Sequence, residues 1–288
     1  MSKIAVVTDS NSGITQAEAK KLGIFVLPMP FTIEDKDYLE DINLTQDQFY
    51  ELLDGDDNIM TSQPSPSDVL DMWDKVLEEY DQIIHIPMSS GLSGSLQTAM
   101  MLAEDYEGKV FVIDNQRISV TQKSSVMDAL RLIDEGKSGE EIAKILLDDK
   151  FNSSIYIMVP SLYYLKKGGR LTPAVAAIGT LLKIKPVLQI QGDKLDAFAM
   201  ARTLGQARSI MINAVKADME KRFGGATPDN CEIFVAHSHN PEEAKIFRQE
   251  IEQEFEGFKV SCVDPLSLSV SCHIGPGAIA IAVNKILK

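Results

Sequence analysis

Short apolar runs alternate with helical segments through the first half of the chain, and this alternation constrains the fold more than any other feature. The runs at residues 3–10, 82–87 and 109–115 are almost continuously hydrophobic. Strands of that kind are typical of parallel sheets whose two faces are both covered by helices. The sequence therefore predicts an N-terminal α/β domain with a mostly parallel sheet and helices on both faces.

Capping residues mark the helices of this half. Thr15 is a candidate N-cap for a helix that Gly23 ends, and Pro66 suits the first turn of a later helix. Residues 24–33 form an apolar run with two prolines. Because proline cannot donate to a strand ladder, we expect this run to be irregular or to lie at a sheet edge.

The second half carries a different pattern. Residues 185–202 contain two strand-like runs that meet at Gly192-Asp193, a hairpin signal foreign to a purely parallel sheet. The other expected elements are strands at 153–160, 231–238 and 258–264, a helix near 240–255 and a C-terminal helix after residue 277. We therefore expect a second α/β domain with a mixed sheet and helices, with the domains at residues 1–158 and 159–288. A cleft between two such domains is a preferred place for a ligand.

The charge balance limits the partners. The chain has 28 basic and 42 acidic residues and a formal net charge of −14. Nucleic acids and anionic membranes need a basic surface, so the sequence predicts neither as the main partner. Cys231, Cys262 and Cys272 lack paired spacing, which predicts neither a disulfide framework nor a metal site.

The start of the chain and the length of its apolar runs bear on localisation. Residues 1–10 lead directly into an apolar run without the pattern of a signal peptide. The longest apolar stretches fall far short of the roughly 20 residues that a membrane helix needs. We expect a cytoplasmic protein without stable membrane insertion.

Residues 88–99, MSSGLSGSLQTA, form a small hydroxyl-rich loop between a strand and a helix. Its GLSGS segment resembles the G-x-S-x-G nucleophile elbow of hydrolases, although the fifth residue is Ser95 instead of glycine. His237, His239 and His273 supply candidate bases for such an enzyme. An ordinary turn is a second interpretation.

A cradle for an anionic group is the third interpretation of this loop, and the one that fits best. The start of a helix has unpaired N–H groups and a favourable dipole for negative charge. Gly91 and Gly94 allow a ligand to approach the backbone closely, and Ser93 and Ser95 add hydroxyl donors. The loop alone does not distinguish a phosphate from a carboxylate, but the chain contains no P-loop sequence.

Three further segments carry candidate functional residues. Residues 61–68, TSQPSPSD, are a stiff hydroxyl-rich loop or simply a linker with a serine N-cap. In SCHIGPGA, His273 stands immediately before an expected helix, as a functional or a structural histidine. In KKGGR, Lys167 and Arg170, with Arg202 downstream, form a basic patch or a solvated face.

Taken together, these segments resemble the DegV family of bacterial fatty-acid-binding proteins. The matching pieces occur in the family's order from end to end of the chain: VTDS, TSQPSP, SSGLSGS, VIDN, YLKKGGRL, KPVLQI and HIGPGA. The resemblance implies a two-domain α/β fold that holds one long-chain fatty acid in a tunnel between the domains. It also implies a non-catalytic, lipid-presenting subunit of a fatty acid kinase, with no cofactor of its own. By the same resemblance, a separate ATP-dependent kinase subunit is expected to form the acyl phosphate for phospholipid synthesis.

The resemblance also implies roles for individual residues. The ligand-binding positions, at or near the carboxylate, are Thr61, Ser62, Ser93, Gly94 and His273. The positions expected to meet the kinase are Lys167, Arg170 and Arg202. Residues 174–182 are expected to contribute to the tunnel wall. An acyl-ester hydrolase that uses Ser93 and His273, or a module that binds a small phosphorylated molecule, remains open as an alternative.

Overall fold

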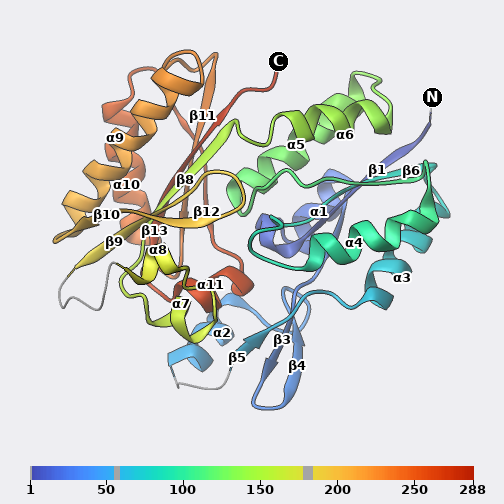
Figure 1. The fold of residues 1–288 in the computed structure, drawn as a ribbon, viewed down its shortest axis with the longest axis horizontal. Coiled ribbons are helices and arrows are strands. Elements are labelled where there is room, and N and C mark those ends of the chain that lie inside the picture. Colours follow the sequence, from blue (N-terminus) through green and yellow to red (C-terminus); the bar gives the residue numbers. More distant parts are fainter. Residues whose placement is uncertain (1, 55–58, 178–183) are drawn as a thin grey trace. The chain divides into compact units, whose positions relative to one another are not determined.

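A computed structural model describes residues 2–54, 59–177 and 184–288 of the chain (Figure 1). The chain forms two compact units, each described here by itself. The first unit contains Met1–Lys150 and, far along the sequence, Ser267–Ser269. The second contains Phe151–Leu266 and Val270–Lys288.

The first unit is built on a four-stranded parallel sheet in the order β2-β1-β6-β7. Its strands are β1 (Ile4–Asp9), β2 (Phe25–Leu27), β6 (Gln82–Ile86) and β7 (Val110–Val112). Its helices are α1 (Gln16–Leu22), α2 (Gln46–Asp54), α3 (Pro66–Leu77), α4 (Ser95–Ala103), α5 (Val120–Asp134) and α6 (Gly139–Asp148), with short 3-10 turns η1 (Ser10–Ser12) and η2 (Glu104–Tyr106). The predicted parallel α/β fold of this half is confirmed.

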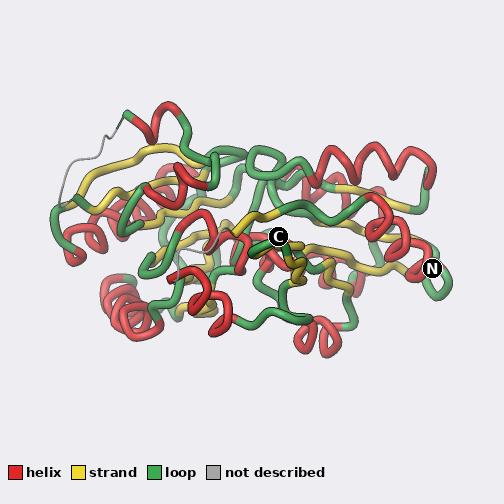
Figure 2. Tube along the Cα trace, turned by 90° about the horizontal axis from the view of Figure 1, so that it is seen from below, coloured by secondary structure: helices red, strands yellow, loops and turns green. Residues whose placement is uncertain are grey.

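Helices cover both faces of this sheet (Figures 1 and 2). On one face α3 and α4 bury Trp73 and Ala99 against alternate strand residues such as Val7 and Ile83. On the other face α5 and α6 pack, and Gln122 of α5 donates to the Thr8 hydroxyl at 3.1 Å. Because both faces of the sheet are covered, most strand residues on either face are buried and apolar, and the runs are almost continuously hydrophobic.

A small antiparallel sheet with the order β4-β3-β5 was not predicted. Its strands are β3 (Pro30–Ile33), β4 (Lys36–Leu39) and β5 (Ile59–Thr61). The turn between β3 and β4 places Glu34 and Asp35 at φ values of 47° and 63°, without the Asn-Gly signal that usually marks such a turn. The proline-containing run at residues 24–33 is split between β2, at the edge of the parallel sheet, and β3, so its predicted irregularity is confirmed.

The second unit contains a six-stranded sheet in the order β10-β9-β8-β13-β11-β12. Its strands are β8 (Ser153–Met158), β9 (Lys185–Ile190), β10 (Leu195–Ala201), β11 (Cys231–His237), β12 (Val260–Pro265) and β13 (Ile279–Lys285). Only the β11–β12 pair is parallel within this sheet, and β9 and β10 form the expected hairpin. The predicted mixed sheet is therefore confirmed.

The helices of the second unit are α7 (Tyr163–Lys167), α8 (Pro173–Ala176), α9 (Leu204–Arg222), α10 (Pro241–Glu254) and α11 (Leu268–Ile274). The long helices α9 and α10 share one apolar core with the sheet, and Met211 and Phe247 are fully buried in it. In the parts of the chain that are described, no helix is long and apolar enough to cross a membrane.

Two expectations about the second half require correction. A helix was expected after residue 277, but Ile279–Lys285 is β13, a central strand whose residues are buried except the last. The expected domain boundary after residue 158 places β8 in the first domain, whereas β8 pairs with β9 and β13 and the units divide at Lys150.

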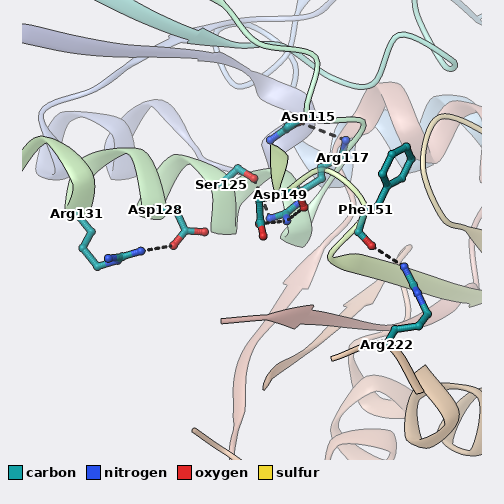
Figure 3. A network of polar contacts seen from close by, with 8 residues as sticks. All are labelled: Asn115, Arg117, Ser125, Asp128, Arg131, Asp149, Phe151 and Arg222. Carbon is teal, nitrogen blue, oxygen red and sulfur yellow. Dashed lines mark hydrogen bonds and ion pairs between the residues drawn. The ribbon is translucent and has the colours of Figure 1, made fainter. Parts of the chain in front are cut away.

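The chain is anchored on both sides of this division (Figure 3). In the first unit the buried Arg117 guanidinium pairs with Asp149 at 2.5 Å and donates to Ser125 Oγ at 3.0 Å. In the second unit Arg222 donates to the Phe151 carbonyl at 2.5 Å. Each unit therefore holds its own end of the connection at Lys150.

Candidate ligand-binding site

The serine-rich loop follows β6 and ends at α4. Ser90 Oγ donates to Asp114 Oδ2 at 2.7 Å, which ties the loop to the segment after β7. The Ser89 carbonyl accepts the N–H of Ser93 at 3.2 Å. Two of the four serines therefore hold the loop in place, whereas Ser93 and Ser95 lie at the entrance of the helix.

The first turn of α4 is only partly capped. Ser93 Oγ accepts the N–H of Ser95 at 3.2 Å, and Gly94 at the N-cap position offers no side chain. Among the residues of α4, Thr98 is the first whose N–H donates to a backbone carbonyl, that of Gly94 at 3.1 Å. The Ser95 hydroxyl is buried and has no hydrogen-bond partner among the described residues. Because helix N-termini attract negative charge, this turn offers donors to an anion.

The second hydroxyl-rich segment lies beside this turn. Thr61 ends β5, and the N–H of the exposed Ser62 donates to the backbone of β3. Gln63 Nε2 donates to Thr98 Oγ1 at 2.9 Å, and its Oε1 would lie 3.1 Å from a Cβ at Gly94. The structure therefore brings these two loops together through Gln63, a residue that the sequence analysis did not single out.

The geometry of the loop does not favour a serine nucleophile. A nucleophile elbow places its serine on the turn that directly follows a strand, whereas β6 ends at Ile86, well before Ser93. The histidine of the first unit, His85, is buried against Trp73 with 5.5 Å between ring centroids. Burial lowers the pKa of His85 to about 3. The described part of the first unit therefore offers no histidine base to Ser93.

Two buried carboxyl groups lie at the end of β1 and next to it. Asp9 accepts the N–H of Met88, the first residue of the serine loop, at 2.8 Å. Glu40 accepts the Ser10 hydroxyl and the Leu268 N–H, both at 2.5 Å. Burial raises the pKa of both groups, that of Glu40 to about 7. These carboxyl groups therefore anchor the serine loop and a segment far along the sequence.

That distant segment, Ser267–Ser269, is called the strap here because the chain crosses from the second unit to the first and back. Ser267 Oγ donates to Asn11 Oδ1 at 3.1 Å, and Leu268 donates to Glu40 as described. The strap includes the first residues of α11, and His273 lies in the last turn of the same helix.

In the second unit His273 belongs to the last turn of α11, not to the residues before a helix, so that expectation is corrected. Its ring packs directly on Gly168, where a Cβ would lie 2.0 Å from Nδ1. Reciprocally, a Cβ at Gly275 would lie 2.1 Å from the Tyr164 ring. Ser238 Oγ donates to the Gly275 carbonyl at 2.5 Å. The KKGGR and HIGPG segments therefore interlock, whereas the approach of His273 to the serine loop stays a prediction.

The predicted basic residues are all exposed in the second unit. Arg170 folds back so that Nη1 donates to the Gly168 carbonyl at 2.7 Å. Burial, and secondly the charge of Arg170, lowers the pKa of His273 to about 4. Lys167 lies over the Tyr163 ring at 5.9 Å, and Arg202 follows β10. Their role toward a partner stays a prediction.

The expected tunnel wall at residues 174–182 lies partly outside the described residues, which end at 177 and resume at 184. Val175 is buried, whereas Ala174, Ala176 and Ala177 are exposed. No three His, Cys, Asp or Glu side chains gather as metal ligands within the described ranges.

Comparison with known proteins places this geometry in context. The family model described as "Uncharacterised protein, DegV family" matches residues 3–285. A DegV domain-containing protein of Listeria innocua is 30% identical over 287 residues, with 97% of each chain covered. One from Clostridium acetobutylicum is 30% identical over 286 residues, with 97% of this chain and 96% of the relative covered.

Solved structures give the same picture. A DegV family protein from Thermus thermophilus, described by its fatty acid binding, is 29% identical with a TM-score of 0.89, covering 99% of this chain and all of the other. DegV from Bacillus subtilis, described as a fatty acid binding protein, is 28% identical with a TM-score of 0.87 and the same coverage. The fold is therefore that of these proteins along nearly the whole chain.

Proposed function

The chain belongs to the DegV family, and on that premise we propose that it binds one long-chain fatty acid and presents it to a separate ATP-dependent kinase subunit. The kinase subunit forms the acyl phosphate, which is used for phospholipid synthesis, and this chain is the non-catalytic carrier. The likeness to two fatty-acid-binding DegV proteins supports lipid binding. The family resemblance of the motifs supports the role beside a kinase.

The observation that carries the proposed headgroup site is the half-capped first turn of α4. The buried Ser95 hydroxyl lacks a partner among the described residues, and Ser93 lies two residues before it. A buried polar group without a partner costs free energy, and a carboxylate is an acceptor that removes this cost. Thr61 and Ser62 lie beside this turn through Gln63 and add donors to the same headgroup.

Neutral donors suit a carboxylate that must later react. Hydroxyl and N–H groups satisfy the charge of the headgroup, whereas a tight ion pair would quench its nucleophilicity. Most of the affinity comes from the tail, because each buried methylene contributes about 0.8 kcal/mol before the costs of association. In the second unit, His273 is the ligand-binding residue of this proposal.

The Ser93→Ala variant tests the headgroup site. It removes one hydrogen bond to a charged group, so we expect oleate to bind more weakly by about 1.5–3 kcal/mol, with the tail still buried. Affinity is measured by titration calorimetry on delipidated protein. Ser209→Ala, an exposed serine of α9 whose hydroxyl bonds the Gly205 carbonyl, is the matched control and should bind as wild type does.

Mass spectrometry of the purified wild type should find about one co-purified fatty acid per chain. Wild-type protein that neither carries nor takes up fatty acid would refute the carrier function. Hydrolysis of an oleoyl ester that disappears in Ser93→Ala would support the hydrolase alternative instead. If Ser93→Ala still carries fatty acid and binds oleate as tightly as the wild type, the carboxylate is not bound by Ser93.

Neutralising Arg170 or Arg202 tests the partner face. Both side chains are exposed, and surface charge steers association between proteins more than it holds an apolar tail. We expect Arg170→Gln and Arg202→Gln to keep their fatty acid, while kcat/KM for phosphorylation by the kinase subunit falls about tenfold or more. Arg248→Gln, at an exposed i,i+4 pair with Glu252 of α10, is the control. Loss of the fatty acid in either variant would place that arginine at the carboxylate.

A further inference from the structure

The two adjacent glycines of KKGGR serve different physical needs. Gly169 has φ +70°, a left-handed conformation that favours glycine, and no atom lies within 4 Å of a Cβ built there. Gly168 has φ −81° and ψ 0°, which any residue can adopt. The backbone conformation at residue 168 therefore does not require glycine, whereas the lack of room for a Cβ does.

The space at Gly168 is taken by His273. A Cβ at this position would lie 2.0 Å from Nδ1 and 2.7 Å from Cε1 of the imidazole. Real Cβ atoms do not approach so closely, so a side chain at residue 168 must displace the ring. The ring packs flush on the backbone of the KKGGR segment because residue 168 has no side chain.

The same residue holds Arg170. The Gly168 carbonyl accepts Nη1 of Arg170 at 2.7 Å, and the Gly168 N–H donates to the Tyr164 carbonyl at 2.8 Å. Tyr164 in turn packs against Gly275, two residues after His273. The backbone of residue 168 therefore contacts both the His273 imidazole and the Arg170 guanidinium.

We propose that Gly168 is a positioning residue that sets His273, on the headgroup side, and Arg170, on the partner side, relative to each other. The proposal rests on the proposed function, which gives His273 and Arg170 those two roles. A correctly seated headgroup and a correctly presented arginine then depend on the same close contact.

Substitution of Gly168 by alanine, with Gly169→Asn as the matched control, tests the proposal. Asparagine tolerates the left-handed region, so the control changes the neighbouring glycine without touching the imidazole. The ring resonances of the four histidines are titrated by NMR, and His273→Ala identifies the signal of His273. We expect the pKa of His273, about 4 in the wild type, to rise in Gly168→Ala toward its ordinary value of about 6.5 as the ring leaves its buried place. In Gly169→Asn it should stay unchanged.

The effect on phosphorylation is the second readout. With oleate as the bound acid and the kinase subunit added, Gly168→Ala should lower kcat/KM about tenfold to a hundredfold, as a misplacement of about 1 Å does. In a His273→Ala background, which removes the ring, Gly168→Ala should have no further effect. This double variant also shows whether the alanine acts through the ring if Gly168→Ala alone folds poorly.

The outcomes separate this proposal from the proposed function. A His273 titration in Gly168→Ala that matches the wild type would overturn the positioning role, whatever the lipid content. A loss of phosphorylation of equal size in Gly168→Ala with and without His273 would overturn it as well. Wild-type and Gly169→Asn proteins that bind no fatty acid would refute the proposed function, while the titration would still test the contact between Gly168 and His273.

Discussion

Replacing Arg117 by methionine is expected to lower the free energy of unfolding by about 3–5 kcal/mol. The arginine side chain is 1% exposed, and Asp149, its partner at 2.5 Å, is 6% exposed. Arg117 also donates to Ser125 Oγ and to the Asp149 carbonyl, both at 3.0 Å (Figure 3). Methionine fills part of the space but leaves a buried carboxylate without its arginine, which is far more costly than losing a surface pair.

Urea denaturation of delipidated protein measures this effect. Lys144→Met is the control, because Lys144 is 76% exposed and pairs with the exposed Asp148 at 2.6 Å, so we expect a loss below about 1 kcal/mol. The double variant Arg117→Met/Asp149→Leu should recover a large part of the loss, because no buried charge then lacks a partner. A loss in Arg117→Met no larger than that in Lys144→Met would contradict the assignment of Arg117 as a buried structural charge.

Replacing Glu40 by glutamine is expected to change how stability depends on pH. Burial raises the pKa of Glu40 from 4.5 to about 7, helped by the charges of Asp9 and Asp41. The folded chain then keeps a proton that the unfolded chain releases above pH 4.5. This contribution to stability is therefore complete below pH 4.5 and is lost as the pH rises through about 7, a total of about 3 kcal/mol.

Glutamine cannot ionise, so the difference in unfolding free energy between wild type and Glu40→Gln should move by about 3 kcal/mol in favour of the variant between pH 4.5 and 8. The measurement uses the difference between wild type and variant because other groups also titrate over this pH range and contribute to both proteins. The raised pKa of Asp9 acts in the same direction, whereas the lowered pKa of His85 removes stability as the pH falls below 6.5. Glu79→Gln, at an exposed position, is the control for removing one carboxylate. A difference for Glu40→Gln that does not change with pH would contradict the raised pKa of Glu40.

Local chemistry made much of the fold predictable. Thr15 caps α1 and Gly23 ends it in the left-handed conformation, as their residue types indicate. The hairpin of β9 and β10 turns at its Gly-Asp signal. The strand at Ile279–Lys285 was missed because short runs of alanine and isoleucine suit a buried helix as well as a buried strand. Only its pairing with β8 and β11 decides between the two.

Composition makes the two hydroxyl-rich loops of the proposed site recognisable in the sequence, because they follow short strands. Hydroxyl content singles out the serine loop and the segment at residues 61–68, whereas the link between them through Gln63 appears only in the structure. The contact between Gly168 and His273 and the bond between Glu40 and Leu268 join residues far apart in the sequence. No local pattern announces such contacts, because the tertiary fold alone creates them.

The strap has a consequence for the order in which the chain acquires its structure during synthesis. The first unit is almost complete at Lys150. However, Glu40 accepts a hydrogen bond from the Leu268 N–H, and Asn11 accepts one from the Ser267 hydroxyl, and both donors lie far later in the chain. At about 5–20 residues per second, the ribosome needs on the order of ten seconds to make the intervening second unit. During that time the emerging N-terminal unit lacks its last pieces. Its native contacts therefore close only when almost the whole polypeptide has been made.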